Sequence, residues 1–305
     1  MRGNLLNNGR FRSSRAKQGD GLLPYFLISP LIIFIFILAL VPAIFTIVSA
    51  FYKVQLLNPP TKFFGFNNFR NIWHDSAVML SLGNTALYII IGVTISMILG
   101  LLMAVALQKP FKGRSMLIAI MILPWALPGV VEGILWSGIW DSNAGVFNSL
   151  LKSLHLISQY HVFLGQNRLL TIFAIELVQI WQITPLSTLL ILASLQNIPH
   201  EIYESSTIEG CGYFKTLRYI TIPLARPGIA IACIQAIIAT LNVFDQPYVL
   251  NGAASTGASL NMEAYFSSFQ NLDFGEGYAI SLLITIFTLF VSVFVTKLLY
   301  RKVEF

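Results

Sequence analysis

The chain has 305 residues, of which 56% are hydrophobic and only 10% are charged. A soluble globular protein carries about 25% charged residues, so this composition excludes that class and indicates an all-α polytopic membrane protein in contact with lipid. The net charge of +6 does not point to nucleic acid, because the basic residues flank the apolar segments as a membrane topology would place them.

The N-terminal region divides into a basic tail and a long apolar segment. Residues 1–20 contain Arg2, Arg10, Arg12, Arg15 and Lys17 and are predicted to be a cytoplasmic tail. An uncharged run from Gly21 to Tyr52 follows. A cleaved signal peptide has an apolar region of about 7–15 residues, so residues 21–52 are predicted to form an uncleaved first transmembrane helix.

Five further segments form a predicted transmembrane core over residues 80–300, because each has the roughly 20 apolar residues that a bilayer requires. They are 81–107, 115–140, 169–192, 227–250 and 278–299. Six transmembrane helices place both termini on one side. With cytoplasmic termini, five of the 19 lysines and arginines lie outside, namely Lys53, Lys62, Arg70, Lys152 and Arg168. The other 14 lie inside, as the positive-inside rule requires.

A polar segment over 198–223 separates two of these apolar segments. Serine and glutamate side chains around Glu204 are unsuited to lipid, so a helix here must lie in water or against protein. Gly210 permits a sharp turn, and Pro223 suits the first turn of a new helix. Helix connections usually take about 2–8 residues, so this segment is predicted to be a docking element rather than a simple connector.

Four residues in this segment carry a resemblance to the EAA loop of binding-protein-dependent ABC importer permeases. Glu204, Gly210, Ile220 and Pro223 match the pattern in register, whereas Ser205 and Ser206 replace its two alanines. The resemblance implies that 198–223 is a cytoplasmic coupling loop. Residues 200–212 are then expected to form a short helix that ends near Gly210 and docks on an ATPase.

Three other strings resemble the carbohydrate permeases of this family: GFNNFRNIW at 65–73, LPWALPGVVEGILW at 123–136 and FDQPYVLNG at 244–252. The resemblance covers about residues 22–302. It implies the type I ABC importer permease fold, in the inner or plasma membrane of a prokaryote, and transport of a sugar or oligosaccharide. The implied partners are a second homologous permease, two ATP-binding subunits and an extracytoplasmic sugar-binding protein.

Polar residues within two predicted spans are candidates for the substrate pathway. Glu176, Gln179 and Gln182 recur along one helical stripe beside Trp181. In the maltose-type permeases that this chain resembles, sugar contacts come from these two spans. The corresponding positions fall on or beside Gln182, Ile183, Leu186, Thr240 and Val243. Thr240, Asn242, Phe244, Asp245 and Tyr248 offer polar and aromatic groups that also suit a sugar.

Structural roles for these intramembrane polar groups stay open. The α-helical stripe could instead hold helices together by interhelical hydrogen bonds, and Asp245 could reach interfacial water. For Glu132 we expect a structural role, with hydrogen bonding inside the bundle.

No catalytic constellation, metal-ligand spacing or cofactor motif is present in the sequence. A phosphate loop of the form G-x-x-x-x-G-K-[ST] is missing, so ATP hydrolysis is expected in a separate chain. Two other classes compete with this interpretation: a proton-coupled secondary carrier that uses Glu176 or Asp245, and a membrane enzyme acting on lipid or glycan. The carrier leaves the EAA-like loop unexplained, and the enzyme lacks a reactive cluster. An ABC importer permease for a non-sugar solute, such as an amino acid or phosphate, remains an alternative.

Overall fold

The computed structural model describes residues 23–57, 61–252 and 254–299. The chain divides into two compact units, residues 1–45 and 46–305. The tail predicted over 1–20 lies outside the described residues. The first unit is helical where it is described: α1 spans Leu23–Ile35, the π-helical segment η1 spans Phe36–Leu40, and α2, Val41–Ser49, runs into the second unit. Its apolar side chains are largely exposed, as expected for a lipid-facing helix.

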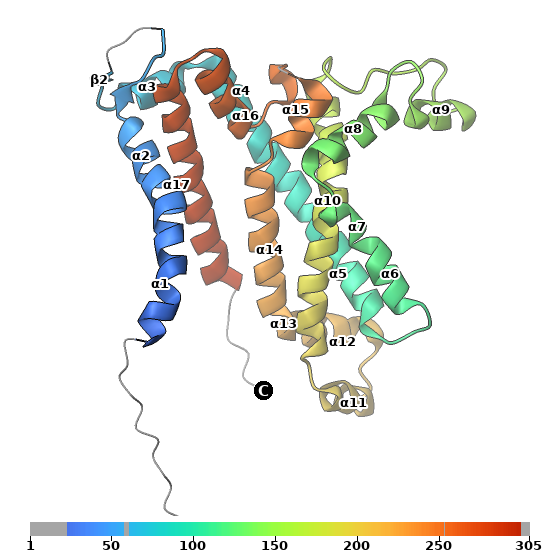
Figure 1. Cartoon of the computed structure of the whole chain (residues 1–305). Coiled ribbons are helices and arrows are strands. Elements are labelled where there is room, and N and C mark those ends of the chain that lie inside the picture. Colours follow the sequence, from blue (N-terminus) through green and yellow to red (C-terminus); the bar gives the residue numbers. More distant parts are fainter. Residues whose placement is uncertain (1–22, 58–60, 253, 300–305) are drawn as a thin grey trace, which may run out of the picture. The chain divides into compact units, whose positions relative to one another are not determined.

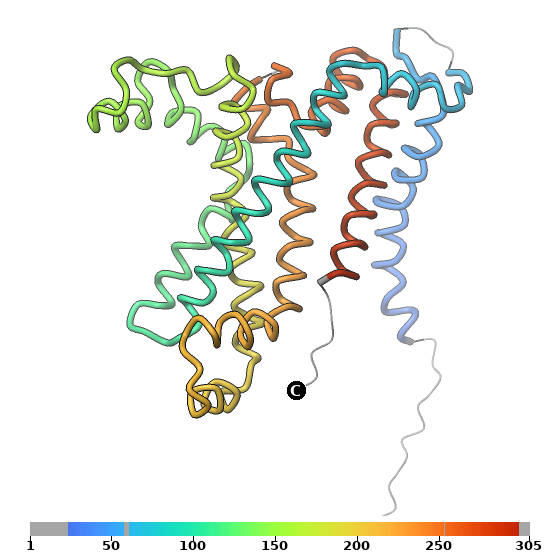
Figure 2. Tube along the Cα trace, turned by 180° about the vertical axis from the view of Figure 1, so that it is seen from behind, coloured from blue at the N-terminus to red at the C-terminus, as the bar shows by residue number. Residues whose placement is uncertain are grey.

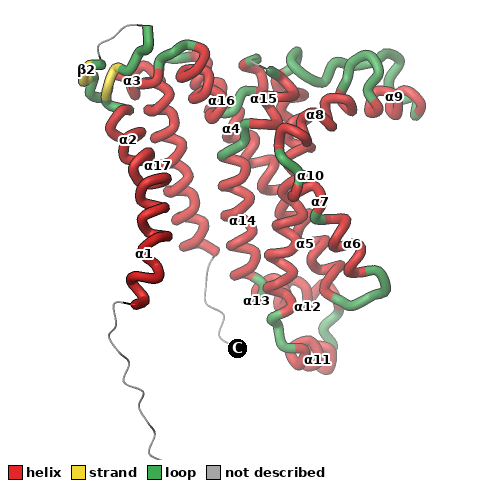
Figure 3. The backbone as a smooth tube through the Cα atoms, viewed as in Figure 1, coloured by secondary structure: helices red, strands yellow, loops and turns green. Residues whose placement is uncertain are grey.

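The second unit begins with two short paired strands and a short helix. Strand β1 (Tyr52–Lys53) pairs antiparallel with β2 (Lys62–Phe63), and α3 spans Asn67–His74. Figure 3 shows these strands in yellow beside α3. The Asp75 carboxylate accepts from the backbone N–H groups of Ala77 and Val78 and thereby caps the next helix.

A continuous helical segment, Ser76–Gln108, then crosses the length of the second unit. It consists of α4 (Ser76–Tyr88), the π-helical segment η2 (Ile89–Val93) and α5 (Thr94–Gln108). After it come α6 (Arg114–Met121), α7 (Leu123–Ala126), α8 (Gly129–Trp140) and α9 (Val146–Ser153).

The longest helix, α10, spans Arg168–Gln196 and packs between α5 and α14 (Arg226–Leu241). Figures 1 and 2 show these three helices side by side from opposite directions. Small residues permit the close approach. A Cβ on Gly228 of α14 would overlap Ser194 of α10, and one on Gly100 of α5 would lie 3.1 Å from the Ser187 Cβ.

Between α10 and α14 the chain forms α11 (His200–Ile208), α12 (Tyr213–Thr216), the π-helical segment η3 (Leu217–Thr221) and α13 (Ile222–Leu224). After α14 come α15 (Asp245–Asn251), the 3₁₀ turn η4 (Ser255–Gly257), α16 (Leu260–Tyr265) and the π-helical segment η5 (Phe266–Gln270). The last helix, α17, spans Phe274–Leu299.

Four helical segments in the described residues are long and apolar enough to cross a membrane: Pro24–Ser49, Ser76–Gln108, Arg168–Gln196 and Phe274–Leu298. Two bent pairs bring the number to six if each pair is one span. They are Arg114–Ala126 with Gly129–Trp140, bent by 98°, and Tyr213–Leu224 with Arg226–Leu241, bent by 70°.

Neither of the segments predicted as single spans over 115–140 and 227–250 is one continuous helix. In the first, Leu127 precedes Pro128 and both are extended, because a following proline disfavours the helical conformation. In the second, α14 ends at Leu241. The carbonyl oxygens freed at that end accept hydrogen bonds from other side chains: Leu241 from Asn261 at 3.0 Å and Val243 from Ser259 at 2.6 Å.

Candidate functional site

The polar residues along one face of α10 lie in two environments: some are buried against neighbouring helices, and one lines a hollow. Glu176 and Gln179 are buried, and no hydrogen-bond partner for the Glu176 carboxylate lies in the described part of the chain. A Cβ on Gly92 would overlap that carboxylate, so Glu176 packs directly against η2. Gln182 is only half-buried. The three residues share one stripe, and of them Gln182 lines the hollow described below.

Gln182 belongs to a hydrogen-bonded network that joins three helices. The Gln246 amide nitrogen, on α15, donates to the Gln182 amide oxygen at 3.0 Å and to a Glu132 carboxylate oxygen of α8 at 2.8 Å. Glu132 has no solvent exposure and Gln246 has 4%. The expected bonding of Glu132 inside the bundle is thus observed. Gln246 was missed by the sequence analysis, although it directly follows Asp245 in the string FDQPYVLNG.

A hollow of about 140 Å³ lies at the half-buried end of this network, between α7, α10 and α14. Its lining contains Trp125, Gln182, Ile183, Leu186, Ser187, Gln235 and Ala239. Three positions singled out from the family resemblance, Gln182, Ile183 and Leu186, therefore lie together. Gln235 was missed, although a lone amide in an apolar helix is a recognisable signal.

Other candidate positions lie outside this hollow. Thr240 and Val243 are buried, and the Thr240 hydroxyl donates to the Ala236 carbonyl oxygen at 2.9 Å. Asn242 is exposed, and its amide donates to the Ile238 carbonyl oxygen at 2.8 Å. Trp181 is 37% exposed, with its ring centroid 5.8 Å from that of Trp136.

The remaining three candidates lie at the start of α15. The Phe244 and Tyr248 rings stack with centroids 5.3 Å apart, and Tyr265 packs edge-on against Phe244 at 5.2 Å. Asp245 is half-buried. A Cβ on Gly129 would lie 2.7 Å from an Asp245 carboxylate oxygen, so α8 and α15 approach closely at this point.

The segment 198–223 forms a compact helix–turn–helix unit. Helix α11 covers only His200–Ile208 of the helix expected over 200–212, and Gly210, just beyond its end, has a φ of 75°, which favours glycine. Glu204 and Ser205 are exposed, whereas Ser206 is buried and its hydroxyl donates to the Tyr203 carbonyl oxygen at 2.8 Å. Ile220 and Pro223 are half-buried on the return towards α14.

The same unit carries four large, exposed apolar side chains that the sequence analysis did not identify. Ile208, Tyr213, Phe214 and Tyr219 are 86%, 63%, 80% and 69% exposed, respectively. We call these four residues the loop patch. Soluble surfaces rarely gather large exposed apolar side chains unless they bind a partner. The signal was available as two adjacent aromatic residues inside an otherwise polar segment.

A hollow of about 610 Å³ lies behind α11 and includes Glu204, Cys211 and the end of α5 in its lining. The Gln108 amide of α5 donates to the Tyr203 hydroxyl across it at 3.0 Å. The loop is thus connected to the long helical segment 76–108 as well as to α10.

Comparison with known proteins decides the family. The model of the family described as "Binding-protein-dependent transport system inner membrane component" matches residues 96–305. The chain belongs to this family. It is a permease subunit of an ABC importer, embedded in the membrane, and the type I permease fold expected from the sequence is confirmed. Its loop 198–223 and most of its predicted spans lie within the matched region.

Several relatives that match nearly the whole permease are named for the transport of carbohydrates. The trehalose/maltose transport system permease protein MalF of Thermococcus litoralis is 32% identical, with 95% of this chain and 96% of that protein covered. The sulfoquinovosyl glycerol transport system permease protein SmoG of Agrobacterium fabrum is 27% identical over 93% and 92%. A chain of a bacterial importer of the polysaccharide alginate has the same fold, with a TM-score of 0.80, 21% identity and coverage of 92% and 96%.

Proposed function

We propose that the permease moves a sugar or oligosaccharide that an extracytoplasmic binding protein delivers. A second homologous permease completes the pathway, and two ATP-binding subunits supply the energy, so this chain performs no hydrolysis itself. The carbohydrate names of the relatives support the substrate class. The amides of Gln182 and Gln235 and the Trp125 indole in one hollow supply the hydrogen bonds and aromatic face that suit a sugar.

The exposed loop patch is the observation that carries this proposal. It lies at the end of the second unit opposite α15 and α16 (Figures 1 and 2). The four apolar side chains surround a glycine turn, and Glu204 is exposed on the preceding helix. This is the composition of a protein-binding surface, with apolar anchors and a charged group beside them. The fitting partner is an ATP-binding subunit on the cytoplasmic side.

A movement of the loop 198–223 would be transmitted through α10 to the hollow lined by Gln182 and Gln235. This helix runs without a break from Arg168 to Gln196 and leads through residues 197–199 into α11. Gln182 is on the same helix, so rotation of α11 would reposition Gln182 relative to Gln235 of α14. Helix α17 runs towards the end that carries α11 (Figure 1), which supports a cytoplasmic C-terminus. The cytoplasmic N-terminus rests on the basic tail.

The proposal is tested with the complex purified from membranes through a tag on the permease. We expect a second permease and an ATP-binding subunit to co-purify. Vesicles that contain this complex should take up labelled disaccharide when ATP and the binding protein are present. Gln182→Leu should reduce uptake while leaving assembly and basal ATP hydrolysis intact. Gln270→Leu makes the same change at an exposed position and serves as the control. Uptake of amino acids or phosphate but no sugar would refute the substrate class.

A further inference from the structure

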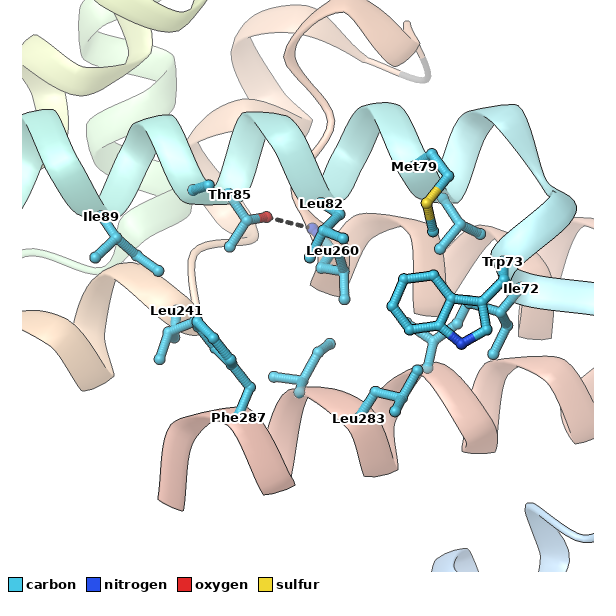
Figure 4. Close-up of a pocket in the computed structure, with 14 residues that line it drawn as sticks. Ile72, Trp73, Met79, Leu82, Thr85, Ile89, Leu241, Leu260, Leu283 and Phe287 are labelled. Atoms are coloured by element: carbon cyan, nitrogen blue, oxygen red, sulfur yellow. Dashed lines mark hydrogen bonds between the residues drawn. The ribbon is translucent and has the colours of Figure 1, made fainter. Parts of the chain in front are cut away.

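A third hollow, of about 180 Å³, lies between α3, α4, α16 and α17, with the end of α14 beside it. Figure 4 shows Trp73 and Met79 near one end and Ile89 and Phe287 near the other. Apart from the Trp73 indole, the one polar side chain in its lining is Thr85. The Thr85 hydroxyl is already engaged, since it donates to the Ser81 carbonyl oxygen at 2.8 Å and accepts from the Leu260 N–H at 2.9 Å. The hollow therefore suits an apolar ligand.

This hollow has a buried floor and an exposed rim. Ile72 and Ile280 in the floor are 1% and 0% exposed, whereas Trp73, Leu82 and Phe287 at the rim are 59%, 40% and 47% exposed. An apolar cavity of about 150 Å³ lined by Leu, Ile and Phe stays dry and takes up small apolar molecules. A hollow of this size and chemistry on membrane-spanning helices is suited to a hydrocarbon chain.

Helix α3, whose Trp73 lines the hollow, also carries a cationic side chain one helical turn away. Arg70, Trp73 and His74 are spaced i, i+3 and i+4 on α3, so they share one face, and all three are exposed. Helix α3 immediately precedes the span that begins at Ser76, which places it at the level of the lipid headgroups. A tryptophan favours that level, and an arginine there attracts an anionic phosphate.

We propose that this hollow binds one acyl chain of an anionic phospholipid, with the lipid phosphate at Arg70. A transmembrane helix from a neighbouring protein is the competing occupant. A helix with its side chains is about 10–12 Å wide, so it could insert only single side chains into this hollow and would leave the cationic α3 face unused. A single acyl chain with its headgroup uses both features. The site is independent of the solute that the permease carries.

The test uses the complete complex in vesicles of phosphatidylcholine with a minority of phosphatidylglycerol, so that the anionic lipid must compete with an excess of neutral lipid for the site. The phosphatidylglycerol carries a photoactivatable group on one acyl chain. We expect illumination to label the α17 peptide around Leu283. Ala86→Phe, which fills the hollow from α4, should reduce this labelling about tenfold, the effect of withdrawing roughly two methylene groups. Ile90→Phe is the control, because Ile90 is exposed on the same continuous helical segment, Ser76–Gln108, and does not line the hollow.

A second pair of variants tests the headgroup. Arg70→Gln should abolish the preference for the phosphatidylglycerol probe over a phosphatidylcholine probe with the same acyl chain, whereas Lys62→Gln, at an exposed position of β2, should preserve it. Leu283→Trp fills the hollow from α17 and replaces Ala86→Phe if that variant does not assemble. Unchanged labelling in both filling variants would overturn the proposal. So would cross-linking of the Leu283→Cys variant, through the new thiol, to the second permease in place of lipid.

Discussion

The loop patch makes the sharpest prediction, because one side chain in it can be removed without disturbing the fold. Phe214 is 80% exposed, and its ring contacts Tyr213 edge-on with the centroids 5.5 Å apart. Phe214→Ala therefore removes little packing within the permease. A surface substitution of this kind changes folding stability by less than about 0.5 kcal/mol. The effect should appear in binding of the ATP-binding subunit.

The expected magnitude follows from the exposed ring. Complete burial of a phenylalanine side chain contributes about 1.5–3 kcal/mol, and most of the Phe214 surface is free to be buried by a partner. Loss of roughly 2 kcal/mol corresponds to an approximately 30-fold weaker Kd. Coupled transport should fall with it, while basal hydrolysis by the free ATP-binding subunit should not change.

The assay is titration of the purified ATP-binding subunit onto the permease pair in vesicles, with the Kd read from bound protein. Phe66→Ala provides the matched control: Phe66 is 74% exposed and lies beside α3, at the opposite end of the second unit from the loop (Figure 1). An unchanged Kd for Phe214→Ala, or an equal loss in both variants, would refute the assignment of the patch.

Three further predictions concern the turn, the network and a buried acid. Gly210→Val should weaken ATPase binding because valine at a φ of 75° costs about 1–2 kcal/mol; Gly212→Val, at a position without positive φ, should bind normally in the same titration. Gln246→Leu should lower thermal stability in detergent by roughly 1–3 kcal/mol, because the buried Glu132 carboxylate loses its 2.8 Å bond; Gln270→Leu should leave the melting curve in place. Burial, and then the nearby Asp75 charge, raises the pKa of Glu263 above its usual 4.5. The folded state therefore holds this proton more tightly, so stability should fall as pH rises from about 4.5 through the raised pKa. Glu263→Gln should flatten the melting temperature between pH 5 and pH 8, and an unchanged slope would contradict this.

Local patterns made the loop predictable from the sequence. Glycine at a left-handed position, prolines at the start of a helix and a charged helix between apolar segments all act over a few residues. Helix α11 and the turn at Gly210 follow from them directly. The break at Leu127–Pro128 also had a signal in the sequence, namely the proline itself. It was missed because the prediction rested on the number of apolar residues, which does not distinguish a bent pair of helices from one straight span.

Contacts between distant segments were beyond the sequence. Gln246 pairs with Glu132, 114 positions away, and with Gln182, 64 positions away. Periodicity places Glu176 and Gln182 on one stripe, but it cannot tell that η2 covers the first and leaves the second beside a hollow. The end of α14 depends on Ser259 and Asn261, which arrive from a later part of the chain.

The most direct test of the account is uptake into vesicles that contain the complete complex, with the energy source controlled. A labelled disaccharide is presented with the binding protein, and ATP is placed on the side of the ATP-binding subunit. We predict uptake only when ATP and the binding protein are both present, with hydrolysis accelerated by the loaded binding protein and both effects reduced in Phe214→Ala. Uptake driven by a proton gradient without ATP would contradict the account.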